Sequence, residues 1–205
     1  MTTLTLEGKG LICERGGRRV FTDVDFSVSS GEALVVTGPN GAGKSSLLRT
    51  ITGLVKQVEG TLTLHGGDPE LSVGAQCHYF GHENALKLQL TVTENVDFWH
   101  RYYGDTGTSV AEALETVRLA QLSHLPAAVL SAGQRRRLSL ARLIVSRRPV
   151  WLLDEPTAAL DAASEKRLGE LMTSHLLDDG IVIAVTHSNL PLAETKSLKL
   201  GEVRP

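Results

Sequence analysis

The chain has 205 residues, of which 41% are apolar and 21% charged, so it is long enough for a substantial core and is not collagen-like, coiled-coil or disordered. Its 21 lysines and arginines are balanced by 23 aspartates and glutamates, which disfavours nucleic acid as a partner. Its two cysteines, Cys13 and Cys77, are too few for a disulfide framework, and its apolar runs are far shorter than the roughly 20 residues of a membrane-spanning helix.

Four short segments near the N-terminus predict a small antiparallel sheet. Residues 3–6, 11–13, 24–28 and 61–64 are partly alternating in polarity, which is typical of strands with one buried face. The last of these segments is followed by Gly66-Gly67, which is typical of a turn after a strand.

Three continuous apolar runs predict a parallel sheet. Residues 33–36, 150–153 and 181–185 are each followed by a turn or polar residue, as expected for strands buried on both faces. In open α/β sheets, ligands bind beyond the carboxyl ends of such strands. The residues predicted to meet at this edge are Gly38, Asp154, Glu155 and His187.

Helical periodicity separates these strands. Apolar residues recur at three- and four-residue steps over 47–54 and 168–176, and the segment 83–148 is predicted to be mainly helical. We therefore expect an α/β fold of the P-loop NTPase class, with a RecA-like parallel sheet, an antiparallel layer and a helical insertion at about 83–148. With no linker or repeat, residues 1–205 are predicted to form a single domain.

A phosphate-binding loop lies between the first apolar strand and the first helix. It matches G-x-x-x-x-G-K-[ST] at every fixed position. Its glycines allow backbone N–H groups to surround a phosphate, while Lys44 would neutralise the β- and γ-phosphates of ATP. The alternative, an ordinary glycine-rich turn, does not explain the strand, the helix and the Lys-Ser pair together. The residues predicted to bind nucleotide here are Gly38, Pro39, Asn40, Gly41, Ala42, Gly43, Lys44, Ser45 and Ser46.

Two acids follow the second apolar strand. Mg²⁺ prefers oxygen ligands, so we expect Ser45 and Asp154 to hold it, and Glu155 to polarise the water that attacks the γ-phosphate. His187, after the third strand, is predicted to contact the γ-phosphate and is assigned with Glu155 to catalysis. Two solvated acids at a strand end are common in isolation, but the phosphate loop favours the catalytic interpretation.

Leu-Ser-Ala-Gly-Gln at 130–134 resembles the LSGGQ signature of ATP-binding-cassette ATPases, with Ala132 in place of the first glycine. The segment 154–161 resembles the Walker B and D-loop motifs of the same family, and His187 resembles its switch histidine. The resemblance implies an ATPase, a translocase that couples hydrolysis to transport, in which each ATP lies between the phosphate loop of one copy and the signature of a second copy. The signature residues implied to contact nucleotide are Ser131, Gly133 and Gln134. Taken alone, the segment is equally an ordinary helix cap.

Two positions depart from the family pattern. Alignment on Glu94 places His82 where a glutamine usually reaches Mg²⁺, so His82 would act through water or be replaced by Glu83. The aromatic residue that usually stacks on adenine is missing. Arg15 lies in the corresponding stretch, and it would either stack on the base through its guanidinium or belong to a plain turn.

Within the family, the short chain, Gly81-His82 and the run Arg135-Arg136-Arg137 resemble the ATP-binding subunits of bacterial cytochrome c maturation (haem export) systems. This resemblance implies a peripheral protein on the cytoplasmic face of the bacterial inner membrane, with a multispanning membrane subunit as partner. The alternatives are an exporter ATPase for a lipid, drug or metal, and a soluble cassette protein acting on ribosomes or DNA.

Overall fold

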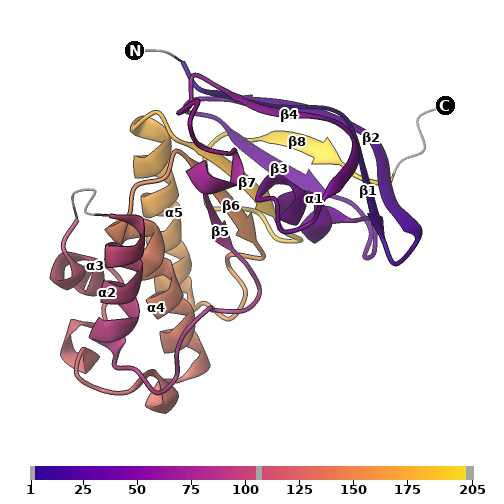
Figure 1. Cartoon of the computed structure of the whole chain (residues 1–205). Helices are drawn as coiled ribbons and strands as arrows, with labels where there is room; N and C mark the ends of the chain where they lie inside the picture. The colour runs from indigo at the N-terminus through magenta and orange to yellow at the C-terminus, as the bar shows by residue number, and fades with distance from the viewer. Residues whose placement is uncertain (1–2, 105–107, 202–205) are drawn as a thin grey trace.

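A five-stranded parallel sheet forms the centre of the computed structural model, which describes residues 3–104 and 108–201 (Figure 1). In spatial order its strands are β5 (Cys77–Phe80), β6 (Val150–Asp154), β7 (Ile181–Val185), β3 (Ala33–Thr37) and β8 (Lys196–Lys199). The three strands predicted from apolar runs, β3, β6 and β7, are therefore confirmed and lie side by side. The two outer strands were not predicted.

The central strands are apolar throughout because both of their faces are covered. Val150 and Leu152 of β6 pack with the antiparallel sheet and helix α1 (Lys44–Ile51), whereas Trp151 and Leu153 pack against the helices on the opposite face. Every residue of β6 and β7 is buried, as expected for central strands of a parallel sheet.

The antiparallel layer is a three-stranded sheet with the order β2-β1-β4, formed by β2 (Arg18–Ser29), β1 (Thr5–Arg15) and β4 (Gln57–His65). The expected layer is thus present, but segments 3–6 and 11–13 contribute to one continuous strand. The pairing of β1 with β2 shifts register between Gly8 and Glu14, and these irregularities interrupt the alternation that would have identified one long strand.

Helix α1 (Lys44–Ile51) packs in the core between the two sheets (Figure 1). Leu47, Leu48 and Ile51 are almost fully buried there, and the two cysteines lie in the same core, both as free thiols. The helix ends at Thr52, and the following Gly53 takes a positive φ of 77°, the conformation that terminates many helices.

The remaining helices cover the other face of the parallel sheet (Figure 1). Along the chain, three helices connect β5 to β6: α2 (Val92–Tyr103), α3 (Val110–Thr116) and α4 (Ala132–Val145). A fourth helix, α5 (Ala162–Leu177), follows β6. Residues 83–91 contain no helix. Short 3₁₀ turns occur at Gly74–Gln76, Ala120–Leu122 and Ala127–Val129. Among the described residues, no helix combines the length and apolarity needed to span a bilayer.

Two histidines lie on the helical side of the sheet, His78 fully buried and His175 half-buried. Nε2 of His78, in β5, lies 2.7 Å from the carbonyl oxygen of Ser146, and burial lowers the pKa of His78 to about 3. The ring of His175 stacks on Trp151 with 4.1 Å between centroids, and burial lowers the pKa of His175 to about 4. Both imidazoles are therefore neutral in the native state.

This predicts a loss of stability in mild acid. An unfolded histidine has a pKa of about 6.5, so below that pH the unfolded chain binds protons that the native chain does not. Between about pH 7 and about pH 5, each histidine should lower the free energy of unfolding by about 2 kcal/mol. Urea unfolding at both pH values measures this change, and His78→Gln should remove about half of it. Equal stability of the wild type at both pH values would contradict the assignment.

Candidate active site

The phosphate loop runs from the end of β3 into the first turn of α1. Gly41 and Gly43 have positive φ values of 85° and 93°, and a Cβ atom on Gly43 would lie 2.7 Å from a methyl carbon of Val20. Glycine is therefore required at position 43 for both conformation and space. Since α1 begins immediately afterwards, its first N–H groups are directed at the loop, an arrangement suited to an anion.

Lys44 is held by the loop that it follows. Its side chain is buried, and its ammonium group donates to the carbonyl oxygens of Gly38 and Pro39 at 2.8 and 3.1 Å. These two bonds use two of the three ammonium donors and place the positive charge beside the glycine-rich backbone.

Asp154, at the end of β6, accepts hydrogen bonds on both carboxylate oxygens. The Ser45 hydroxyl donates to Oδ1 at 3.0 Å, and the Tyr79 hydroxyl donates to Oδ2 at 3.3 Å. Arg49 Nε in turn donates to the Tyr79 oxygen at 3.2 Å, and burial raises the pKa of Tyr79, so the phenol keeps its proton. Tyr79 and Arg49 were missed from the sequence because neither belongs to the fixed positions of a phosphate-loop motif.

Glu155 takes a left-handed backbone conformation, with φ of 47°. Such strain in a residue other than glycine costs on the order of 1–3 kcal/mol and persists only where neighbours hold the backbone in place. Here the Glu155 N–H donates to the carbonyl oxygen of Val185 in β7, at 2.8 Å. The conformation brings the Glu155 carboxylate to 3.7 Å from Nε2 of the exposed His187.

Residues of the loop and of the two strand ends surround one open cavity of about 440 Å³. The structure thus brings together Gly41, Lys44, Asp154, Glu155 and His187. Exposed His82 and signature residues 130–134 do not line it, whereas Arg15 does. The full lining is Arg15, Val20, Asn40, Gly41, Gly43, Lys44, Ser45, Ser46, Asp154, Glu155, Val185 and His187.

The signature segment begins helix α4. The Ser131 hydroxyl accepts from the N–H of Gln134 at 3.2 Å, and the Gln134 side chain accepts from the N–H of Ser131 at 2.8 Å. This reciprocal pair is a capping box, and Ser131 itself is exposed to solvent. The segment is therefore a helix cap, as one of the two interpretations predicted. Because the start of the helix is exposed, it is also accessible to a ligand from outside the chain.

Arg136 connects this helix to the catalytic edge. Its guanidinium donates to the carbonyl oxygens of Gly81 and Glu155, both at 2.8 Å, and lies 3.8 Å from the centre of the Phe80 ring. Burial lowers the pKa of Arg136 to about 10, so it remains charged near neutral pH. The sequence gives no sign of this role, because a run of charged residues such as 135–137 is usually a solvated helix face.

The sequence profile of the ABC transporter family matches residues 21–158, from β2 through the phosphate loop and signature to the acids after β6. The chain belongs to this family. The proteins named cytochrome c biogenesis ATP-binding export protein CcmA are similar to it over nearly their whole length. The Nitrobacter winogradskyi protein is 51% identical over 97% of this chain and 98% of its own, and that of Bradyrhizobium diazoefficiens is 52% identical over 98% and 100%.

Solved ABC transporter structures share the fold. An ATP-binding protein from Pyrococcus furiosus superposes with a TM-score of 0.81 at 25% identity, covering 96% of this chain and 97% of its own. A dimeric ATP-binding cassette with ADP and phosphate bound has a TM-score of 0.76 at 24% identity, covering 89% and 88%. The expected P-loop ATPase fold, with its parallel core, antiparallel layer and helices, is confirmed.

The contacts of Arg136 predict that lysine cannot replace it. Arg136→Lys keeps the positive charge but loses the planar group that joins carbonyls on two strand ends and stacks on Phe80. We expect a loss of about 1–3 kcal/mol in the free energy of unfolding, measured in urea. Arg135→Lys, one residue earlier on the helix, is the matched control. Equal stability of the two variants would contradict the proposed role of Arg136.

Proposed function

We propose that residues 1–205 form one ATP-binding domain, the ATP-hydrolysing subunit of an ABC transporter complex that serves cytochrome c biogenesis. The observation that carries the proposal is the meeting of the phosphate loop, the Asp154 carboxylate and the Glu155 carboxylate around one cavity. The subfamily assignment is supported by relatives of about 50% identity and near-complete coverage that are named as cytochrome c biogenesis export proteins.

In this proposal the loop and Lys44 bind the phosphates of ATP. The N–H groups at the start of α1 face the anion, while the Lys44 ammonium neutralises charge on the β- and γ-phosphates. Further contacts come from the remaining loop residues, Gly38, Pro39, Asn40, Gly41, Ala42, Gly43, Ser45 and Ser46. Arg15 lines the same cavity and would stack on the base through its guanidinium.

Ser45 and Asp154 are the proposed magnesium residues. Their side-chain oxygens lie 3.0 Å apart and are the hard oxygen donors that Mg²⁺ prefers. When bound, Mg²⁺ supplies charge neutralisation at the phosphates. Tyr79 holds the second oxygen of Asp154 and thereby fixes the direction in which the carboxylate faces the cavity.

Glu155 is the proposed general base, with His187 as its neighbour. The left-handed backbone turns the Glu155 carboxylate toward the imidazole instead of continuing the line of β6. From there it can orient a water molecule and accept its proton, while His187 donates to the γ-phosphate.

A second copy of the chain would complete each site. Ser131, Gly133 and Gln134 lie outside the cavity, at an exposed helix start, so they are available to a nucleotide held by another copy. Helix N-termini attract anions, which makes this start suitable for the γ-phosphate. The similar cassette solved with ADP and phosphate is itself a dimer.

We further propose that a multispanning membrane subunit docks beside residues 82–89, which places the chain peripherally on the cytoplasmic face of the inner membrane. The buried Asn95 holds this loop by accepting from the Lys87 N–H and donating to the Lys87 and Leu90 carbonyls. Leu88 is left 40% exposed, so the loop offers an apolar contact on a fixed backbone. A short amphipathic helix of the partner fits such a surface.

Replacing the proposed base tests the hydrolysis mechanism. Glu155→Gln keeps the size of the side chain but cannot accept a proton, so ATP turnover should fall by roughly 10²–10⁴-fold while ATP binding persists. Phosphate release by the purified complex measures turnover, and the exposed Glu194→Gln is the matched control. Near-normal turnover in Glu155→Gln would remove Glu155 from this role.

A gene deletion tests the biological assignment. The deletion strain should lack holo-cytochromes c on a haem-stained gel but keep its b-type cytochromes, because only covalent haem attachment is affected. A wild-type copy should restore them, whereas a Lys44→Ala copy, which lacks the phosphate-binding charge, should not. Normal c-type cytochromes in the deletion strain would contradict the subfamily role and leave the ATPase assignment intact.

A further inference from the structure

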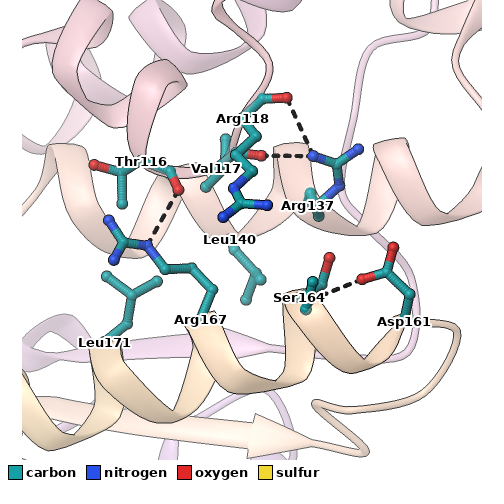
Figure 2. Close-up of a pocket in the computed structure, with 10 residues that line it drawn as sticks. Thr116, Val117, Arg118, Arg137, Leu140, Asp161, Ser164, Arg167 and Leu171 are labelled. Atoms are coloured by element: carbon teal, nitrogen blue, oxygen red, sulfur yellow. Dashed lines mark hydrogen bonds between the residues drawn. The ribbon is translucent and has the colours of Figure 1, made fainter.

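A second cavity, remote from the phosphate loop, lies between helices α3, α4 and α5 and has a volume of about 280 Å³ (Figure 2). It shares no lining residue with the cavity of the active site. Val117, Leu140 and Leu171 give it an apolar wall, and three arginines, Arg118, Arg137 and Arg167, are among its other lining residues.

Three arginines converge on this cavity from three parts of the chain. Nη1 of Arg137, on α4, donates to the carbonyl oxygens of Val117 and Arg118 at 3.0 and 3.1 Å. Nε of Arg167, on α5, donates to the carbonyl oxygen of Thr116 at 3.3 Å. Both guanidiniums are therefore anchored on the C-terminal end of α3. Nη1 of Arg167 also pairs with the Glu170 carboxylate on the same helix at 2.7 Å, and each guanidinium keeps further N–H donors.

The third arginine has no such anchor. The Arg118 side chain points into the cavity between Arg137 and Arg167 (Figure 2). Within the described part of the chain, the exposed Arg118 guanidinium receives no hydrogen-bond acceptor from these three helices, and its electrostatic neighbours are the carboxylates of Asp161 and Glu170. One carboxylate, Asp161, lines the cavity with the three arginines, and Glu170 pairs with Arg167 beside it, so the three arginines exceed their two acidic neighbours by one charge. Oδ1 of Asp161 already accepts from the N–H of Ser164 at 2.8 Å.

The backbone at Arg118 is also unfavourable for an arginine. Its φ is 56°, and the bonds from Arg118 N to Glu115 O (2.9 Å) and from Leu119 N to Leu114 O (2.8 Å) form the helix-terminating motif that usually contains glycine. A glycine here would avoid both the strained backbone and the third positive charge. The backbone conformation alone therefore favours glycine, and the exposed arginine side chain is available to an anion as well as to Asp161 and Glu170.

We propose that this cavity binds a small organic dianion of the dicarboxylate class. Its two carboxylates would pair with the guanidiniums of Arg118, Arg137 and Arg167, and its short carbon chain would lie over the apolar wall. The surplus of positive charge over Asp161 and Glu170 favours an anion, and the volume suits a small molecule better than a nucleotide.

Binding would connect helices that carry different parts of the active site. Arg137 lies on α4, which starts at the signature, and Arg167 lies on α5, which follows the segment after Glu155. Arg137 and Arg167 are already connected through the carbonyls at the end of α3, and the bound dianion would connect α4 and α5 a second time. The site itself does not depend on the proposed hydrolysis or on a membrane partner.

The test uses the purified full chain without nucleotide, at constant ionic strength, with succinate and glutarate as probes. Either dicarboxylate should raise the melting temperature, and the neutral diamide of the same length should not. Arg118→Gly should weaken binding measured by calorimetry at least 10-fold, since a charged hydrogen-bonding partner is lost. The same variant should melt at a higher temperature than the wild type without ligand, because glycine relieves the backbone strain.

Two controls locate the binding site. Arg101→Ala, which removes an exposed arginine on α2, and Lys44→Ala, which removes the phosphate-loop charge, should both keep the wild-type response. Loss of the response in Lys44→Ala would place the anion at the phosphate loop and overturn the proposal. Absence of a response to both dicarboxylates, or an unchanged affinity in Arg118→Gly, would overturn it as well.

Discussion

The structure depends on one constraint, the burial of strand β6 on both faces. Because every residue from Val150 to Asp154 is covered, the polar groups at the end of this strand can lie only at the edge of the sheet. The parallel direction of β3, β6 and β7 brings the phosphate loop and His187 to the same edge. The position of the catalytic groups is thus a consequence of how the core packs.

Two buried polar contacts then set the details of this edge. Asp154 joins α1 through Ser45 and β5 through Tyr79, so three elements share one carboxylate. Arg136 binds the carbonyls of Gly81 and Glu155 and so joins helix α4 to two strand ends. Buried polar groups are costly unless paired, which makes both contacts specific for one arrangement of the elements. A displacement of α4 would therefore move the backbone of Glu155 through the hydrogen bond from Arg136.

The sequence predicted the central strands, α1, α5 and the meeting of Asp154, Glu155 and His187, because these depend on apolar runs and fixed motif spacing, whereas Gly38, predicted with them, does not line the cavity. Strand β8 was missed since Lys196 and Lys199 are exposed edge residues, and β5 since only four residues form it. Arg136 and Tyr79 could not be predicted, because their partners are distant in the chain and are set by tertiary packing: Arg136 lies 55 residues from Gly81 and 19 from Glu155, and Tyr79 lies 75 residues from Asp154.

The capping box at Ser131 has a consequence for how two copies approach each other. The oxygen of its hydroxyl is occupied as an acceptor from the Gln134 N–H, whereas its hydrogen is not needed by the cap. A hydroxyl that accepts one hydrogen bond becomes a more strongly polarised donor for the next. Folding of the helix start and attraction of an anion therefore use opposite ends of the same O–H group and reinforce each other. The isolated chain thus keeps this donor oriented and ready before any second copy arrives.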